Sequence, residues 1–175
     1  MKKALIVVDY QHDFVSGSLG FPGAVELEGR IERKIVDCLA EQASLLFTFD
    51  THAPDYLSTQ EGRKLPVPHC EKGTEGWKLY GAVAKYLPKA AACFEKTTFG
   101  SLELAEYLKA SGFDVVELVG LVSNICVLSN AILAKAALPE AEIVVDAACT
   151  ASADASMNEK ALDILQGVQV VIKNR

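Results

Sequence analysis

Short apolar runs alternate along the chain with longer segments in which apolar residues recur every three or four positions. This alternation constrains the fold more than any other feature, because unbroken apolar runs are typical of strands buried on both faces. The predicted strands are Ala4–Val8, Ser44–Phe49, Ala91–Phe94, Asp114–Val119, Glu142–Val145 and Val168–Ile172. The predicted helices are Glu26–Gln42, Gly76–Tyr86, Ser101–Ala110, Asn124–Ala137 and Asp154–Gln166.

Strands that alternate with helices form right-handed crossovers, and these produce a parallel sheet. We therefore expect an α/β fold, a three-layer α/β/α arrangement around a doubly wound, six-stranded parallel sheet. The length of 175 residues predicts one domain, residues 1–175, with a core large enough to fold without disulfides. Two long connections, Tyr10–Val25 and Thr51–Glu75, interrupt the alternation. Long loops in a compact domain usually carry function.

Composition disfavours several classes of protein. A net charge of -6 argues against a general nucleic-acid binder. The longest uncharged run, Leu118–Ala134, contains serine and asparagine and is too short for a membrane span. The apolar run Ala4–Val8 is too short for a signal peptide. Five scattered cysteines without a CxxC pair suit a reducing compartment. We expect a cytoplasmic protein that acts on a small molecule, not on nucleic acid or a membrane.

Chemically reactive residues follow four of the predicted strands. Asp9 ends the first strand, Asp50 and then His52 follow the second, Lys96 follows the third, and the segment after the fourth leads to Cys126. In doubly wound sheets, ligands bind outside the carboxyl ends of the strands. The strand assignment therefore predicts that an acid, a histidine, a lysine and a cysteine meet at one edge of the sheet.

Cys126 is the candidate nucleophile. Capping by Ser123 or Asn124 would place Cys126 in the first turn of a helix, where free amides and the helix dipole lower a thiol pKa and can hold an oxyanion. Asp9 could accept the thiol proton and return it to a leaving group, and Lys96 could keep both groups charged. Position alone leaves other roles open: a small core residue for Cys126, a loop cap for Asp9 and a solvated side chain for Lys96.

The second long connection holds a candidate metal site. Asp50-x-His52 is followed by His69, which lies next to Pro68, and Glu61 on the same connection is a possible further ligand. Carboxylate and imidazole groups suit a divalent metal. The Asp-x-His pattern alone is also common without any metal. Cys70 is a softer ligand type, and we expect it to point away from the site.

Five stretches together resemble one family. They are ALIVVDYQHDF, TFDTHAPDY, LPVPHCEKGTEGW, FEKTTFGS and VGLVSNICVLSNA, and they extend over nearly the whole chain. The sequence resembles the isochorismatase-like cysteine hydrolases and, within them, is most similar to nicotinamidases, which are also called pyrazinamidases. The resemblance implies the isochorismatase-like hydrolase fold and a catalytic triad of Asp9, Lys96 and Cys126. It also implies a non-proline cis peptide at Leu121–Val122.

The resemblance further implies how the site binds its ligands. The amides of Val122 and Cys126 would form an oxyanion hole, and Phe14 and Leu121 would contact the substrate. The metal ligands would be Asp50, His52 and His69, with Glu61 as our choice for a fourth. The expected cofactor is a divalent metal, zinc in the first instance, with manganese or iron as alternatives.

The implied activity is deamidation of nicotinamide to nicotinate and ammonia through a thioester, a step of NAD salvage. One departure stands out: Leu65–Pro68 has no aromatic residue, whereas many nicotinamidases have one there. A family hydrolase acting on another small amide, ureido or vinyl-ether substrate is the alternative, followed by a catalytically silent binding protein. The net charge favours a neutral amide over the dianion isochorismate. Homo-oligomers are common in such families, and the uncharged run Leu118–Ala134 faces either a partner copy or the core.

Overall fold

The computed structural model describes residues 1–175, and a six-stranded parallel sheet forms its centre. The strands lie in the order β3-β2-β1-β4-β5-β6, and every neighbouring pair is parallel. The chain therefore winds outward from β1 in both directions, as the sequence predicts. The strands are β1 (Lys3–Val8), β2 (Ser44–Asp50), β3 (Ala92–Lys96), β4 (Val115–Leu121), β5 (Glu142–Ala151) and β6 (Val171–Lys173).

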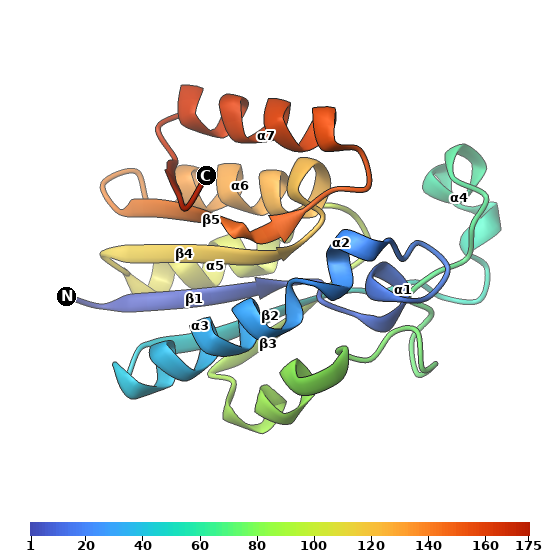
Figure 1. The fold of residues 1–175 in the computed structure, drawn as a ribbon, viewed down its shortest axis with the longest axis horizontal. Coiled ribbons are helices and arrows are strands. Elements are labelled where there is room, and N and C mark those ends of the chain that lie inside the picture. The colour runs from blue at the N-terminus through green and yellow to red at the C-terminus, as the bar shows by residue number, and fades with distance from the viewer.

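Helices cover both faces of the sheet. The α-helix α3 (Glu28–Ala40) and the 3₁₀ segment η2 (Gly81–Lys89) lie on one face. The other face carries α5 (Leu102–Ser111), α6 (Leu128–Ala137) and α7 (Ala155–Gly167) (Figure 1).

The inner strands of the sheet supply both layers of the core. In β1, Ala4, Ile6 and Val8 pack under α5 to α7, whereas Leu5 and Val7 pack under α3. Because alternate residues of a strand point to opposite faces, an unbroken apolar run is what this three-layer arrangement requires.

Local signals at the helix ends explain where several helices start and stop. The Ser101 side chain accepts a hydrogen bond from Leu104 N, and the Asp154 side chain accepts from Ser156 N and Met157 N, so both act as N-caps. Helix α5 ends at Gly112, which has a left-handed conformation with φ of 62°.

Three predicted elements differ from the structure. The helix expected over Gly76–Tyr86 is the 3₁₀ segment η2, which begins at the left-handed Gly81. Strand β5 continues to Ala151, past a register shift against β4. The last strand starts later than Val168, because Val168 N still donates to Ile164 O at the end of α7.

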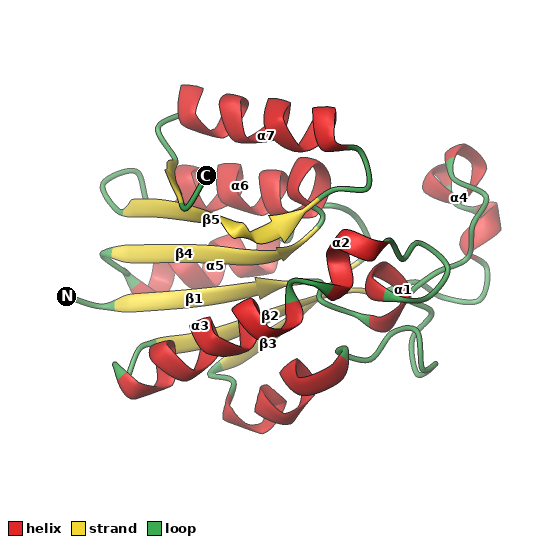
Figure 2. Ribbon diagram, viewed as in Figure 1, coloured by secondary structure: helices red, strands yellow, loops and turns green.

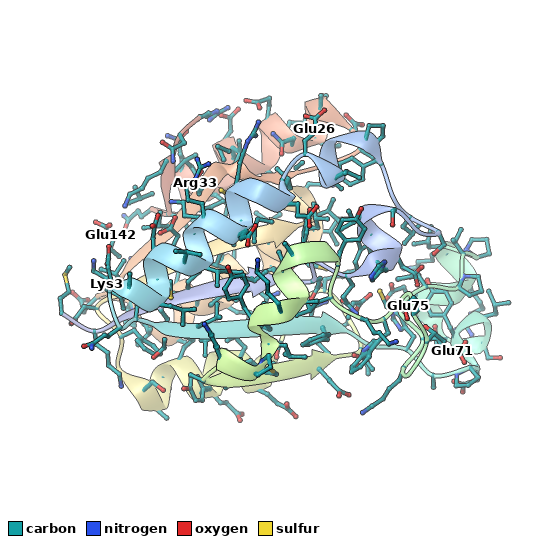
Figure 3. All side chains as sticks on the ribbon, turned by 60° about the horizontal axis from the view of Figure 1, so that its bottom comes forward. Lys3, Glu26, Arg33, Glu71, Glu75 and Glu142 are labelled. Carbon is teal, nitrogen blue, oxygen red and sulfur yellow. The ribbon has the colours of Figure 1, made fainter.

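The two long connections form short helices at the carboxyl ends of the strands (Figure 2). These are α1 (His12–Val15), α2 (Pro22–Val25), η1 (Tyr56–Ser58) and α4 (Gln60–Lys64), none of which the apolar pattern predicts. The connections hold each other in place, since Asp13 Oδ2 accepts a hydrogen bond from Cys70 N at 2.7 Å. In Figure 3, Glu71 and Glu75 mark this end of the molecule, and Lys3 and Glu142 mark the opposite end.

The uncharged run Leu118–Ala134 forms the end of β4, a turn and most of α6. Leu118, Val119, Leu121, Val127 and Ala131 are fully buried, so the core accounts for most of its lack of charge. No helix of the structure has the length and apolar character needed to cross a membrane. All five cysteines are free thiols, and only Cys93 is exposed.

We expect Gly120→Ala to destabilise the protein more than Gly112→Ala. Both glycines have positive φ, 111° and 62°, which costs an alanine about 1–2 kcal/mol. A Cβ at Gly120 would also overlap the carbonyl oxygen of Val8, whereas nothing lies within 4 Å of one at Gly112. The free energy of unfolding in urea should therefore fall by about 3 kcal/mol or more for Gly120→Ala. Equal losses in the two variants would show that β4 does not approach β1 this closely.

Candidate active site

Four strand ends bring the predicted reactive residues together. Asp9 directly follows β1, and Asp50 and Lys96 are the last residues of β2 and β3 and register partners in the sheet. Cys126 lies in the turn after β4. All four side chains are buried. Adjacent parallel strands that end at the same level thus account for the cluster, as expected from the strand assignment.

Lys96 lies at the centre of this cluster. Its Nζ is 2.6 Å from Asp9 Oδ2, 3.2 Å from Asp50 Oδ1 and 3.4 Å from Cys126 Sγ, and it donates to the carbonyl of Thr98 at 3.0 Å. Burial alone would lower the pKa of Lys96, but the neighbouring Asp9, Cys126 and Asp50 raise it above its ordinary value. Lys96 is therefore a permanent positive charge beside the thiol.

Thr48 holds the Asp9 carboxylate from the other side. The Thr48 hydroxyl, fully buried in β2, donates to Asp9 Oδ1 at 2.6 Å, which leaves Oδ2 for Lys96. Burial raises the pKa of Asp9, and the positive charge of Lys96 opposes this rise. A carboxylate with a raised pKa is better suited to accept and return a proton than an exposed aspartate.

The turn that carries Cys126 is a π-helical turn, η3 (Ser123–Val127), which leads into α6. Val127 N donates to Val122 O, five residues earlier, and no side chain caps the turn, so the expected cap at Ser123 or Asn124 is absent. The Leu121–Val122 peptide is cis, as expected. The Val122 N–H donates to no other group of the chain and is free to bind a ligand oxygen.

The ionisation of Cys126 differs from our prediction. We expected the helix start to lower the pKa of this thiol. Burial and the negative charge of Asp9 instead raise it well above the ordinary value, although Lys96 acts in the opposite direction. The raised pKa disfavours the thiolate, so attack by this sulfur requires a nearby base to accept the proton.

Asp50 also belongs to a second cluster, with His52 and His69. Asp50 Oδ2 lies 3.1 Å from His52 Nε2 and 3.3 Å from His69 Nε2, and all three residues are buried. The His69 Nδ1 lies 2.8 Å from the carbonyl of Val67, which can only accept, so Nδ1 donates and Nε2 faces Asp50. Hydrogen bonds from the two histidines lower the pKa of Asp50 despite its burial.

The donor set of this cluster suits a divalent metal ion. The ligand atoms of Asp50, His52 and His69 lie within 4.8 Å of one another, and nitrogen and oxygen donors of this kind bind zinc and similar metals. Glu61 Oε1, on α4, is 3.9 Å from both histidine Nε2 atoms. Burial and the nearby Asp50 raise the pKa of Glu61, and a bound cation would reverse that effect. Cys70 is fully buried in the core, as expected for a residue that points away.

Gln11 fixes the backbone at Asp50. Its side chain accepts from Asp50 N at 2.8 Å and donates to Asp50 O at 2.9 Å and to Trp77 O at 2.7 Å. We did not single out Gln11 or Thr48 from the sequence. For Gln11 a signal was available, because it is a polar residue two positions after Asp9 in a connection that we expected to be functional. For Thr48 there was none, since its bond to Asp9 spans 39 residues.

A cavity of about 260 Å³ opens above Cys126. Most of its wall is apolar, and no lysine or arginine lines it. Phe14 lines the wall as expected. Its ring packs edge-on against the ring of His69, with 5.5 Å between the ring centroids. The Leu121 side chain, which we expected at the substrate, is fully buried in the core because the strand directs it away from the cavity, and Val122 lines the wall instead. The lining residues are Phe14, Leu19, Phe21, Asp50, Glu61, Leu65, His69, Phe99, Val122, Asn124, Ile125, Cys126, Ser152, Ala153 and Asp154.

Known proteins share both this sequence pattern and this fold. The nicotinamidase/pyrazinamidase of Mycobacterium tuberculosis is 32% identical over 152 residues, which cover 74% of this chain and 76% of that protein. The pyrazinamidase of Pyrococcus horikoshii, solved in complex with zinc, superposes with a TM-score of 0.85 at 25% identity over 98% of both chains. The N-carbamoylsarcosine amidase of Thermoplasma acidophilum has a TM-score of 0.81 at 27% identity and covers 99% of this chain and 96% of its own.

The family assignment follows from a match over almost the entire sequence. The model of the isochorismatase domain matches residues 3–174, which include all six strands and every residue of the two clusters. The chain belongs to the isochorismatase family of hydrolases.

Proposed function

We propose that this protein is a cysteine-dependent amidohydrolase that converts nicotinamide to nicotinate and ammonia. The observation that carries the proposal is the convergence of the Cys126 thiol, the Asp9 carboxylate and the Lys96 ammonium at the base of one small cavity. A silent binding protein has no need to bury an acid and a lysine against a cysteine, because burying charges is costly. The nicotinamidase among the relatives supports this choice of substrate.

The first half of the reaction breaks the carbon–nitrogen bond. Asp9 accepts the Cys126 proton, and the thiolate attacks the carboxamide carbon while Lys96 stabilises the negative charge. The amides of Val122 and Cys126 bind the oxyanion of the tetrahedral intermediate. Asp9 then gives its proton to the leaving NH₂ group, and ammonia departs from a thioester.

The second half restores the enzyme. Asp9, again a carboxylate, accepts a proton from a water molecule that attacks the thioester carbonyl. The carbon–sulfur bond breaks, the carboxylic acid product forms, and Cys126 recovers its proton from Asp9. Thr48 keeps the Asp9 carboxylate in one orientation through both proton transfers, because it binds the oxygen that does not face Lys96.

Asp50, His52 and His69 would hold a divalent metal ion such as zinc, with Glu61 as a fourth ligand. When bound, such an ion supplies a Lewis acid that can orient a substrate nitrogen beside the nucleophile. Gln11 would help to hold Asp50 in place for this role, since its side chain bonds both the N–H and the carbonyl of Asp50. The zinc complex of a pyrazinamidase relative supports the choice of metal.

The cavity wall favours a neutral substrate. Carboxylate-bearing substrates such as N-carbamoylsarcosine or isochorismate need a positive partner, and no lysine or arginine lines the wall. The net charge of -6 adds general repulsion of anions. Phe14 offers a face for a flat ring, and about 260 Å³ suits a small ligand. A small aliphatic amide is the second candidate, because Leu19 and Leu65 give part of the wall an aliphatic surface.

Removal of the nucleophile should abolish ammonia release. We expect Cys126→Ala to lower kcat for nicotinamide by at least ~1,000-fold, because no other group can form the thioester. Ammonia release should be measured over nicotinamide, pyrazinamide, a small aliphatic amide and N-carbamoylsarcosine. Cys93→Ala is the matched control, since Cys93 is exposed on the edge strand and should leave the rate unchanged. Turnover by Cys126→Ala close to the wild-type rate would disprove the mechanism.

Activity should fall on the acid side at a higher pH than a free aspartate would give. Burial raises the pKa of Asp9, and its protonation as pH falls removes the base. We therefore expect the acid limb of kcat/KM to have an apparent pKa above about 4, the value of an unperturbed aspartate. A pH profile at saturating metal measures this limb. An apparent pKa at or below that value would mean that Asp9 is not the base.

Metal binding should depend on the Asp50 cluster. Purified protein should retain about one zinc ion after dialysis, and chelator treatment should remove both metal and activity. We expect His69→Ala to weaken zinc binding at least about tenfold and Glu61→Gln to weaken it less, as measured by competition with a chromogenic chelator. His12→Ala is the control, because His12 lies outside the cluster. Wild-type protein that binds no divalent metal would rule out this part of the proposal.

A further inference from the structure

One buried polar residue next to the active site is still without a role. Asn130 lies on α6 and is fully buried, and its side-chain amide uses both ends. Its Oδ1 accepts from Ser101 N at 3.0 Å, and its Nδ2 donates to the carbonyl of Phe99 at 3.1 Å and to the carbonyl of Cys126 at 2.8 Å. Three bonds from one buried amide join the turn at Cys126 to a loop that lies 29 to 31 residues before Asn130 in the chain.

The first segment, residues 97–101, is the loop after β3, which we call the lysine loop. Its Thr98 carbonyl accepts a hydrogen bond from Lys96 Nζ, and its Phe99 side chain lines the cavity. The loop rests directly on α6, because a Cβ at Gly100 would come within 2.7 Å of Leu133 Cδ1 and 3.5 Å of Ser129 Cβ. The position of this loop therefore determines where the Thr98 carbonyl meets Lys96 and where Phe99 lines the cavity.

The second segment is the nucleophile turn, Ser123–Val127. Asn130 reaches the carbonyl of Cys126 itself, four residues earlier, so it holds the backbone of the residue whose amide would bind the oxyanion. Ser129, the next residue toward the N-terminus, makes a similar bond to Ile125 O at 2.7 Å, but from the solvent side and without a hydrogen bond to the lysine loop. Leucine or alanine at position 130 would leave Ser101 N and the carbonyls of Phe99 and Cys126 without these partners, so the side chain contributes to stability as well as to position.

We propose that Asn130 is a positioning residue that fixes the nucleophile turn and the lysine loop relative to each other, so that Cys126, Lys96 and Phe99 meet the substrate in one geometry. The inference rests on the proposed function for its kinetic consequences. Its structural part concerns the reactivity of Cys126 and stands without any substrate.

Two variants separate the two contacts of Asn130. Asn130→Thr keeps a hydroxyl that can donate to the carbonyl four residues earlier, so it retains the bond to Cys126 O and loses those to the lysine loop. Asn130→Asp keeps an acceptor for Ser101 N but loses both donors and sets a carboxylate against two carbonyl oxygens.

We expect alkylation of Cys126 by iodoacetamide, followed by peptide mass spectrometry, to slow by about tenfold or more in Asn130→Asp, because the nucleophile turn is displaced. In Asn130→Thr the rate should stay within about threefold of wild type, because the bond to the turn survives. With nicotinamide, Asn130→Asp should lower kcat, whereas Asn130→Thr should mainly raise KM through the loosened Phe99 wall.

Leu165→Ala is the control for loss of stability, because Leu165 is buried in α7, in the core cluster that also contains Cys126. This variant should lower Tm and leave the alkylation rate of Cys126 unchanged. Equal alkylation rates in Asn130→Thr and Asn130→Asp, or losses that follow Tm across all three variants, would overturn the proposal. If wild-type protein does not turn over nicotinamide, the proposed substrate fails, and the alkylation rates still decide the role of Asn130.

Discussion

The buried positive charge of Lys96 is the constraint on which the site depends. An ammonium that is 4% exposed is tolerable only if negative partners surround it. Asp9 and Asp50 supply that compensation from the ends of β1 and β2, on the two strands nearest to β3. The parallel alignment of these strands therefore also keeps the two carboxylates close enough to compensate the charge of Lys96. Asp50 binds Lys96 through one oxygen and the two histidines through the other, so the Lys96 cluster and the histidine cluster share one carboxylate.

Chemistry and selectivity come from different parts of the chain. In the proposed mechanism, the groups that make and break bonds lie at strand ends or directly after them. Much of the cavity wall comes from the two long connections, through Phe14, Leu19, Phe21 and Leu65. Relatives with the same fold are named for different amides, nicotinamide in one case and N-carbamoylsarcosine in another. A reactive cluster at strand ends below a wall built from long loops is one way in which a single fold can serve several substrates.

The sequence was sufficient to predict the sheet and the convergence of four reactive side chains, because both follow from where apolar runs end. It was not sufficient for features that depend on distant contacts. The π-helical turn at Cys126 is one of these, since Asn130 and the lysine loop join there. The raised pKa of Cys126 is another: helix position suggested the opposite direction, and burial beside Asp9 outweighs it. The burial of the Leu121 side chain in the core is a third, because a resemblance indicates a segment and not the direction of each side chain.

The position of β1 in the middle of the sheet has a consequence for how the molecule is made. The first strand of the chain pairs with β2 and with β4, so half of its hydrogen bonds wait for residues 115–121 to be synthesised. Parallel pairings of such long sequence separation form slowly. A nascent chain made only as far as β3 contains Asp9, Asp50 and Lys96 but lacks the Cys126 thiol. The cluster is complete only when β4 pairs with β1 and the turn after β4 brings Cys126 beside Lys96.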